Sequence, residues 1–174
     1  MTTILQDPAE EIRFALGAFS LGKVLVAASP RGIAAILMGD SEETLRRELA
    51  AAFPHTRPVA DETGLADTIA KIASFLDAPH QGLNLPLDIR GSALEQAVWQ
   101  ALRKIPAGQT TTYGQIAKSL ALPATAQDVG AACAANVLAV AIPCHRVVKA
   151  DGSIAGYRWG VARKRKLINR EAVA

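Results

Sequence analysis

The sequence has few cysteines and few aromatic side chains. Only two of its 174 residues are cysteine, Cys133 and Cys144, and Phe, Trp and Tyr together make up 5%. Two thiols cannot cross-link a chain of this size, and no further cysteine stands near them in the pattern of a zinc site. The sequence therefore excludes a disulfide scaffold, and we expect reduced thiols.

Long apolar runs are also absent. A stretch near the middle without charge or proline, residues 129–142, is mostly alanine and contains Asn136. It is shorter than the roughly 20 strongly apolar residues of a membrane-spanning helix. The first residues, MTTILQDPAEE, lack the basic start and apolar core of a secretory signal. We therefore expect a cytoplasmic protein with no membrane segment.

Charge is distributed unequally along the chain. Residues 1–90 carry 8 Lys/Arg and 12 Asp/Glu, a net −4, whereas residues 91–174 carry 11 and 4, a net +7. A basic half points to a polyanionic partner, of which nucleic acid is the commonest. For the RKRK run at 163–166, a solvated helix face is the alternative interpretation.

The first half of the chain predicts a small α+β unit. Three apolar stretches within residues 12–38, separated by turns that contain glycine, predict a three-strand meander. Apolar residues at helical spacing predict helices over about 41–53 and 65–78, each ended by a proline. Segments 54–64 and 82–91 are expected to be a loop and an unpacked connector.

Helices dominate after Gly91. Ser92 and Glu95 form a capping box for a helix that ends before Pro106. The segments TTYGQIAKSLA and ATAQDVGAACAAN predict two short helices joined by a tight turn, as in a helix-turn-helix that binds nucleic acid. Simple packing of an alanine-rich helix pair is the alternative.

The residues that carry chemistry lie within NVLAVAIPCHRVVKADGSIAGYRWG, residues 136–160. A strand-like apolar run ends at Pro143, and Cys144 and His145 follow directly. The thiolate is the nucleophilic form of cysteine, and a nearby imidazole and the basic Arg146 favour it. Neighbours in a strand point to opposite faces, so Cys144 and His145 face each other only if the chain turns there. A buried structural cysteine is the alternative.

Two motifs in this stretch resemble a known family. IPCHRVV at 142–148 and GYRWG at 156–160 resemble the O6-alkylguanine-DNA alkyltransferases, and CAANVLAVAIPCHRVV is especially similar to the carboxy-terminal part of the bacterial adaptive-response protein. The resemblance covers roughly residues 90–171. It implies an α/β (α+β) fold, with an RNase H-like domain over 1–85 and a mostly helical, winged-helix-turn-helix domain over 86–174.

The resemblance implies a single-turnover transfer of an alkyl group, such as methyl, from O6 of guanine or O4 of thymine in DNA to Cys144. The thioether product has no carbonyl for water to attack, so the cysteine is used once. No cofactor is implied. Zinc is not expected, because His55 and His80 stand alone in the sequence. The implied partner is double-stranded DNA, bound through its minor groove by a monomer.

Individual roles also follow from the resemblance, by position. His145 would lie in a water-linked hydrogen-bond chain between Cys144 and Glu171, and Asn136 would support the surrounding turn. The remaining contacts to the base, the phosphates and the DNA backbone would come from Tyr113, Thr125, Ala126, Gln127, Arg146, Val147, Tyr157 and Arg158.

Gln127 departs from the family pattern, in which an arginine at this position fills the space left by a flipped base. A neutral amide fills space and hydrogen-bonds, but it has no charge and a shorter reach. This departure keeps open a protein that binds alkylated bases with weak transfer. An unrelated Cys/His hydrolase is a third hypothesis, although no oxyanion loop is evident. Cys133 is interpreted as a packing residue.

Overall fold

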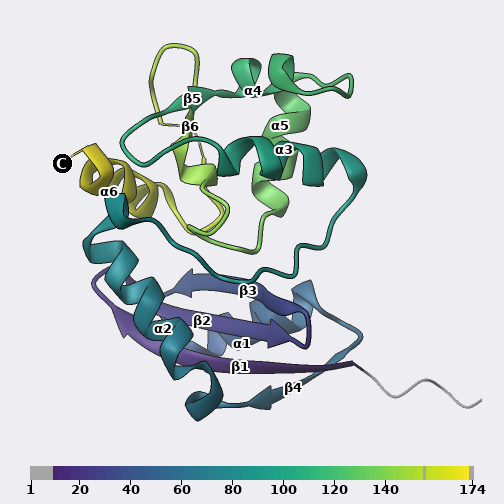
Figure 1. Cartoon of the computed structure of the whole chain (residues 1–174), viewed down its shortest axis with the longest axis vertical. Coiled ribbons are helices and arrows are strands. Elements are labelled where there is room, and N and C mark those ends of the chain that lie inside the picture. Colours follow the sequence, from purple (N-terminus) through teal and green to yellow (C-terminus); the bar gives the residue numbers. More distant parts are fainter. Residues whose placement is uncertain (1–9, 155, 173–174) are drawn as a thin grey trace, which may run out of the picture.

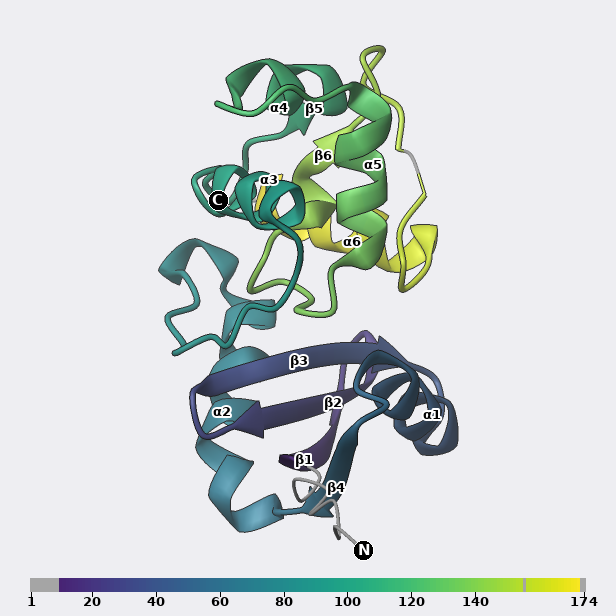
Figure 2. The same cartoon turned by 90° about the vertical axis from the view of Figure 1, so that its right-hand side faces the viewer.

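A computed structural model describes residues 10–154 and 156–172 of the chain. A small sheet flanked by helices is followed by a mostly helical part, which lies along one edge of the sheet (Figures 1 and 2). The predicted fold class, an α+β unit followed by a helical unit, is confirmed. The proposed boundary between residues 85 and 86 falls in the connector and stays a prediction.

The amino-terminal unit is a four-stranded sheet with one helix on each face. Its elements are β1 (Glu10–Phe19), β2 (Gly22–Ser29), β3 (Gly32–Gly39), α1 (Glu42–Ala52), β4 (Thr56–Ala60) and α2 (Glu62–Asp77). The strand order is β3-β2-β1-β4, with antiparallel pairing except between β1 and β4. Figures 1 and 2 show α1 and α2 on opposite faces. The predicted meander and both predicted helices are confirmed.

The interpretation of residues 54–64 as a loop was wrong. Residues Thr56–Ala60 form β4, which pairs in parallel with the start of β1. The strand is short, largely exposed and contains Pro58. Proline lacks an N–H for the sheet ladder and is tolerated at an edge, which is where β4 lies. An edge strand of this kind has no alternating apolar pattern that the sequence could reveal.

The described residues after α2 form four α-helices and several short elements. These are η1 (Pro79–Gln81), α3 (Ala93–Arg103), β5 (Thr111–Thr112), α4 (Tyr113–Ser119), α5 (Ala126–Ala135), η2 (Cys144–Arg146), β6 (Val147–Val148) and α6 (Val161–Ala172). Capping boxes begin α3, α4 and α5 at Ser92, Thr112 and Thr125. The predicted helix pair is confirmed as α4 and α5. The parallel pairing of β5 with β6 was not predicted.

The connector over residues 82–91 is packed, contrary to expectation. The N–H of Ile33 in β3 donates to the carbonyl of Pro86 over 2.8 Å, and the N–H of Asp88 donates to the carbonyl of Ile33 over 2.8 Å. Asp88 is buried and accepts a hydrogen bond from Ser29. The prolines and charges indicated a loop, but they could not show that its backbone completes the edge of a sheet.

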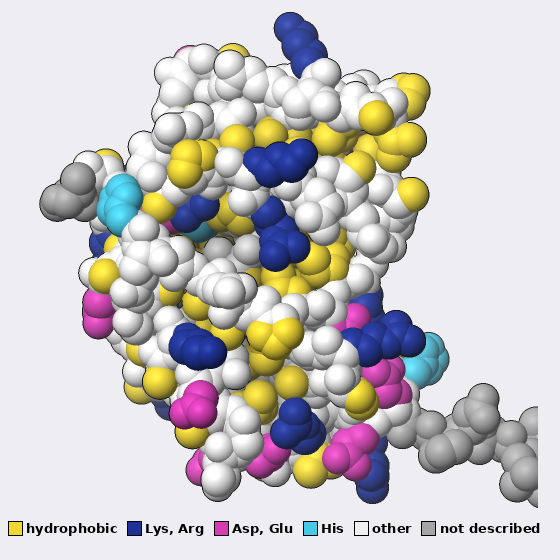
Figure 3. Space-filling model, in the orientation of Figure 1, with side chains coloured by type: hydrophobic (Ala, Val, Ile, Leu, Met, Phe, Trp, Pro, Cys, Tyr) yellow, Lys and Arg dark blue, Asp and Glu magenta, His cyan; other side chains and the backbone are white. Residues whose placement is uncertain are grey.

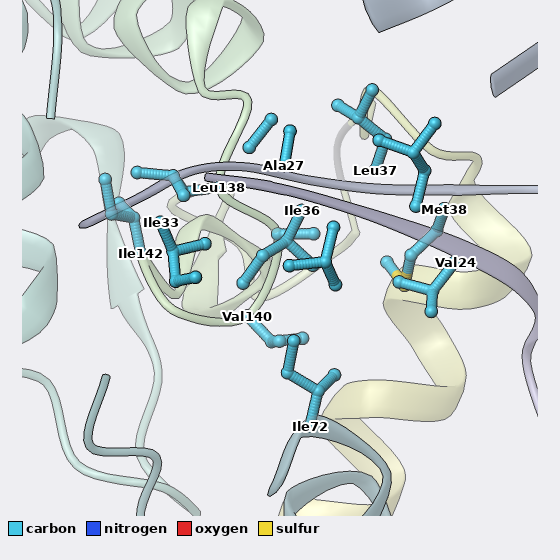
Figure 4. Close-up of a cluster of buried hydrophobic side chains, with 14 of the residues drawn as sticks. Val24, Ala27, Ile33, Ile36, Leu37, Met38, Ile72, Leu138, Val140 and Ile142 are labelled. Atoms are coloured by element: carbon cyan, nitrogen blue, oxygen red, sulfur yellow. The ribbon is translucent and has the colours of Figure 1, made fainter. Parts of the chain in front are cut away.

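The apolar run before Pro143 is also paired with β3. The N–H of Ile36 donates to the carbonyl of Val137 over 2.8 Å, and the N–H of Ala139 donates to the carbonyl of Ile36 over 3.0 Å. The run was expected to be strand-like; instead it makes one bridge at Leu138 and then turns. Its apolar side chains join the cluster formed by the sheet and α2, shown in Figure 4 with Ile36, Ile72, Leu138, Val140 and Ile142 labelled.

We predict that Gly32→Ala weakens the docking of the connector on β3. Gly32 has φ +149°, and a Cβ there would lie 2.6 Å from the carbonyl oxygen of Pro86. Strain and steric clash together should lower the free energy of unfolding by about 2–4 kcal/mol. Gly82 also has a positive φ, +79°, but a Cβ there meets nothing within 4 Å.

Gly82→Ala is therefore the control, because it introduces backbone strain at a positive φ but no steric clash. Urea denaturation of both variants measures the difference. Equal losses in the free energy of unfolding would show that the clash with the carbonyl of Pro86 does not add to the destabilisation.

Candidate active site

Cys144 lies on the floor of a cavity in the helical unit. It begins the short helix η2, directly after Pro143, and is only 3% exposed. The cavity has a volume of about 390 Å³, and the residues that line it come from α4, α5, η2 and the loop before α6: Tyr113, Gly130, Cys133, Ala134, Cys144, Gly156, Tyr157 and Arg158. The sulfur is thus nearly enclosed by protein but borders a space open to a small group.

Asn136 holds the turn that carries the cysteine. Its Nδ2 donates to the carbonyl of Ile142 over 3.0 Å and to the Sγ of Cys144 over 3.3 Å, while its Oδ1 accepts from the N–H of Leu138 over 2.8 Å. The side chain is 1% exposed. Within the turn, Val140 has φ +59°, a conformation that costs free energy for a β-branched residue. Asn136 therefore stabilises a strained backbone next to the thiol.

His145 and Glu171 are in direct contact inside the protein. The Nε2 of His145 lies 2.5 Å from Oε1 of Glu171, and the imidazole is fully buried. The chain turns at Cys144 and His145 because both lie in η2 rather than in a strand. Among the residues that the structure describes, Nδ1 of His145 has no hydrogen-bond partner. A buried ring nitrogen without a protein partner is a site for a bridging water.

Arg146 lies inside the protein rather than on the DNA-facing surface that the sequence suggested. Its Nε donates to Glu171 over 2.8 Å, its Nη2 donates to the same carboxylate over 2.9 Å, and its Nη1 donates to the carbonyl of Ile105 over 2.6 Å. The residue is 7% exposed. A guanidinium engaged in this way cannot reach a phosphate, so its contribution is to hold Glu171.

The protonation states of this buried group follow from its contacts. Burial raises the pKa of Glu171, but the hydrogen bonds from His145 and Arg146 outweigh this effect and lower it to about 2. Burial lowers the pKa of His145, against the opposing effect of Glu171. An ionised carboxylate facing a neutral imidazole places the ring proton on Nε2 and leaves Nδ1 as a proton acceptor.

Lys164 is a feature of the site that the sequence analysis missed. It lies on α6, is 1% exposed, and its Nζ donates to the carbonyl of Gly156 over 3.4 Å, 5.9 Å from the ring centre of Tyr113. Burial raises the pKa of Cys144, and the hydrogen bond from Asn136 and the charge of Lys164 offset this effect only in part. The expectation that His145 and Arg146 favour the thiolate was wrong for the resting protein, because both are bonded to Glu171. The buried face of α6 comprises Lys164, Leu167 and Glu171. These three residues recur at the spacing of one helix face. This spacing is the sequence signal that could have distinguished the buried Lys164 from the other residues of the RKRK run.

The other predicted residues fall into two groups. Tyr113, Tyr157 and Arg158 line the cavity, whereas Val147 does not line it and is fully buried, with its N–H donating to the carbonyl of Cys144. The second group lies at the start of α5, where the side chain of Thr125 caps the helix and Ala126 and Gln127 are exposed. The structure brings the first group together around Cys144 and leaves the second on the surface.

Two features are absent from residues 10–154 and 156–172. No group of three or more His, Cys, Asp or Glu side chains is arranged to hold a metal ion there. No helix in this part of the chain is long and apolar enough to cross a membrane.

We predict that the carboxylate of Glu171 makes stability depend on pH. Its folded pKa of about 2 lies below the ordinary value of 4.5, so its contribution is present above pH 4.5 and is lost as the pH falls toward 2. This contribution is about 2–3 kcal/mol for so large a difference in pKa. Glu171→Gln should therefore be less stable at pH 7 and lose less stability on acidification.

Glu62→Gln, which removes an exposed carboxylate, is the control and should follow the wild-type pH dependence. Urea denaturation between pH 7 and pH 3 provides the measurement. A Glu171→Gln curve parallel to that of the wild type would contradict the expected role of Glu171.

Known proteins resemble the chain in both sequence and structure. The family profile described as "6-O-methylguanine DNA methyltransferase, DNA binding domain" matches residues 93–173. The bifunctional transcriptional activator/DNA repair enzyme Ada of Escherichia coli is 48% identical over 161 residues, which are 92% of this chain and 46% of Ada. The chain thus spans about half the length of the Ada proteins it matches.

Two mycobacterial proteins match over a larger share of their own length. The methylated-DNA–protein-cysteine methyltransferase of Mycobacterium bovis is 44% identical over 111 residues, 64% of this chain and 67% of that protein. The crystal structure of Mycobacterium tuberculosis OGT in complex with DNA superposes with a TM-score of 0.74 and 28% identity, covering 93% of this chain and 92% of that one. The chain belongs to the methylated-DNA–protein-cysteine methyltransferase family.

Proposed function

We propose that this protein repairs DNA by transferring an alkyl group, methyl above all, from O6 of guanine to Cys144. The observation that carries the proposal is the cysteine on the floor of a cavity, hydrogen-bonded to Asn136 and adjacent to the buried His145–Glu171–Arg146 group. The family relatives support the same activity, since they are named as methylated-DNA–protein-cysteine methyltransferases.

The reaction we propose is one displacement at a saturated carbon. The thiol of Cys144 loses its proton through a bridging water to Nδ1 of His145, and Glu171 stabilises the imidazolium that forms. The thiolate attacks the alkyl carbon, the C–S bond forms as the C–O bond breaks, and the guanine leaves with the electron pair on O6. The nearby charge of Lys164 stabilises the thiolate.

The hydroxyl of Tyr113, at the cavity wall, donates a hydrogen bond to the departing guanine. The guanine anion takes its proton from water, to which the imidazolium of His145 returns the proton that came from Cys144. The carbonyls of Cys144 and Val147 and the backbone at Tyr157 and Arg158 are proposed to hold the base. The product is a thioether, which water cannot hydrolyse at this site, so each molecule acts once. O4-alkylthymine is a second substrate of the same chemistry.

Access to the base requires its extrusion from the duplex. The O6 atom of guanine is inaccessible to the buried sulfur while the base is stacked, and flipping costs a few kcal/mol. We propose that α4 and α5 enter the minor groove, with Thr125, Ala126 and Gln127 against the strand. Ala126 permits close approach to the backbone, and Gln127 fills the space that the base vacates.

The charge distribution agrees with a polyanionic partner for the helical unit. On the face seen in Figure 3, acidic side chains lie mainly over the amino-terminal half, and the half that carries Cys144 shows few. One chain supplies every group in the proposed reaction, so we propose a monomer. A reduced Cys144 requires a reducing compartment such as the cytoplasm.

Gln127 favours a second candidate function, a protein that binds alkylated bases and transfers slowly. The exposed side chain at the start of α5 is neutral, so it gives the flipped state no cationic contact. Weak flipping combined with an intact thiol site gives binding without efficient repair. The two functions differ in the rate of transfer from duplex DNA and not in the chemistry at Cys144.

We predict one alkyl adduct on Cys144 after a stoichiometric challenge with an oligonucleotide that contains O6-methylguanine. Cys144→Ala should abolish the gain in mass, because no other group in the cavity shares its contacts with Asn136. Cys133→Ala removes the second thiol that lines the cavity and is the matched control. Intact-mass measurement and peptide mapping decide the outcome, and an unmodified wild-type protein would falsify the proposal.

We predict that Gln127→Arg accelerates repair of duplex lesions by about tenfold, the effect of roughly 1.4 kcal/mol of added stabilisation of the flipped state. Repair of the free base should change little, because flipping is not required. Gln100→Arg adds the same charge at an exposed position of α3 and controls for general attraction to DNA. Equal acceleration by both variants, or equal gains on both substrates, would refute a specific role at position 127.

A further inference from the structure

Arg158 connects the wall of the cysteine cavity to the amino-terminal unit. It lies in the loop that lines the cavity, next to Tyr157. Its Nε donates to Oε1 of Glu48 over 2.9 Å, and its Nη1 donates to the carbonyl of Ala134 over 3.0 Å. Glu48 and Arg158 are separated by 110 positions in the sequence. The loop at the reacting group is therefore attached to a helix of the other unit.

Glu48 is held in place by the packing of its own helix. It lies on α1 beside Leu49, which is 1% exposed, and one turn after Leu45, which is fully buried. The side chains of Glu48 and Arg158 are 22% and 27% exposed. Because about three quarters of each side chain is covered, solvent weakens this ion pair less than one between fully exposed side chains. The carboxylate thus lies on a packed helix within hydrogen-bond distance of the guanidinium.

The same guanidinium joins two walls of the cavity. Ala134, near the end of α5, lines the cavity from one side, and the loop residues 156–158 line it from another. Because Arg158 bonds the carbonyl of Ala134 as well as Glu48, its position sets the separation between helix and loop. This separation is one dimension of the cavity beside Cys144.

A second cavity provides space into which the Arg158 side chain can rotate. It lies between the two units, has a volume of about 530 Å³, and is lined by Arg158 together with Phe53, His55, Trp99 and Asn136. Arg158 therefore borders both cavities. Without the carboxylate of Glu48, the guanidinium can turn toward this second space and release the carbonyl of Ala134.

We propose that Glu48 is a positioning residue for alkyl transfer, acting through Arg158 to keep the base cavity over Cys144 in its binding shape. The proposal rests on the alkyl-transfer function proposed above. It assigns the amino-terminal unit an indirect part in substrate recognition, through Arg158. Glu48 does not touch the reacting atoms, so its effect falls on the fit of the base and not on the reactivity of the thiol.

The test compares Glu48→Gln with Asp40→Asn. Asp40 forms a second ion pair between the units, with Arg163 on α6 over 2.5 Å, but neither residue lines the cysteine cavity. The rate of Cys144 alkylation by a short single-stranded oligonucleotide that contains O6-methylguanine is measured against its concentration, by intact mass. We expect Glu48→Gln to raise the half-saturating concentration about fivefold to tenfold, the loss of one charge-assisted hydrogen bond. The maximal rate should change less than twofold.

Asp40→Asn should leave both quantities at the wild-type values. In an Arg158→Gln background, Glu48→Gln should have no further effect, since the two residues act as one unit. A Glu48→Gln variant indistinguishable from Asp40→Asn, or additive effects of the two substitutions, would overturn the inference. Failure of the wild type itself to become alkylated would instead contradict the proposed function.

Discussion

The backbone pairing between β3 and residues 137–139 is the constraint on which the site depends. Ile36 of β3 both donates to and accepts from this segment, so the chain enters the reactive turn from a fixed point on the sheet. Asn136 then bonds the far side of the turn and the sulfur of Cys144. A thiol on a free loop would sample many positions, whereas this one is aligned before any substrate arrives.

Burial of charged groups is the energetic cost of this arrangement. Glu171, His145 and Arg146 are removed from water, and each is compensated by hydrogen bonds to another member of the group or to backbone. Lys164 is less well compensated, with one long hydrogen bond to Gly156. Buried groups that are this poorly paired are costly for stability, and their retention at a nucleophile fits a catalytic electrostatic role.

Several specific contacts join the two units, although the units differ in net charge and architecture. The amino-terminal sheet supplies the edge that holds the reactive turn, and α1 supplies the carboxylate that holds Arg158. Arg163 and Asp40 add a further ion pair between the units. The acidic unit thus holds the active-site turn and the cavity loop of the basic unit in place, and the surface around α4 and α5, which we propose binds DNA, takes no part in these contacts.

Local sequence determined the elements with regular periodicity or capping, and the chemistry of one motif. The helices α1 to α5 and the meander β1–β3 follow from spacing, proline stops and capping boxes, and the PCHRV motif is the sequence basis for proposing Cys144 as the nucleophile. Tertiary structure alone decided the pairing of β4, the packed connector, the burial of Arg146 and the ion pair of Glu48 with Arg158. These features depend on partners far apart in sequence, and no local pattern encodes which distant backbone or charge a residue will meet.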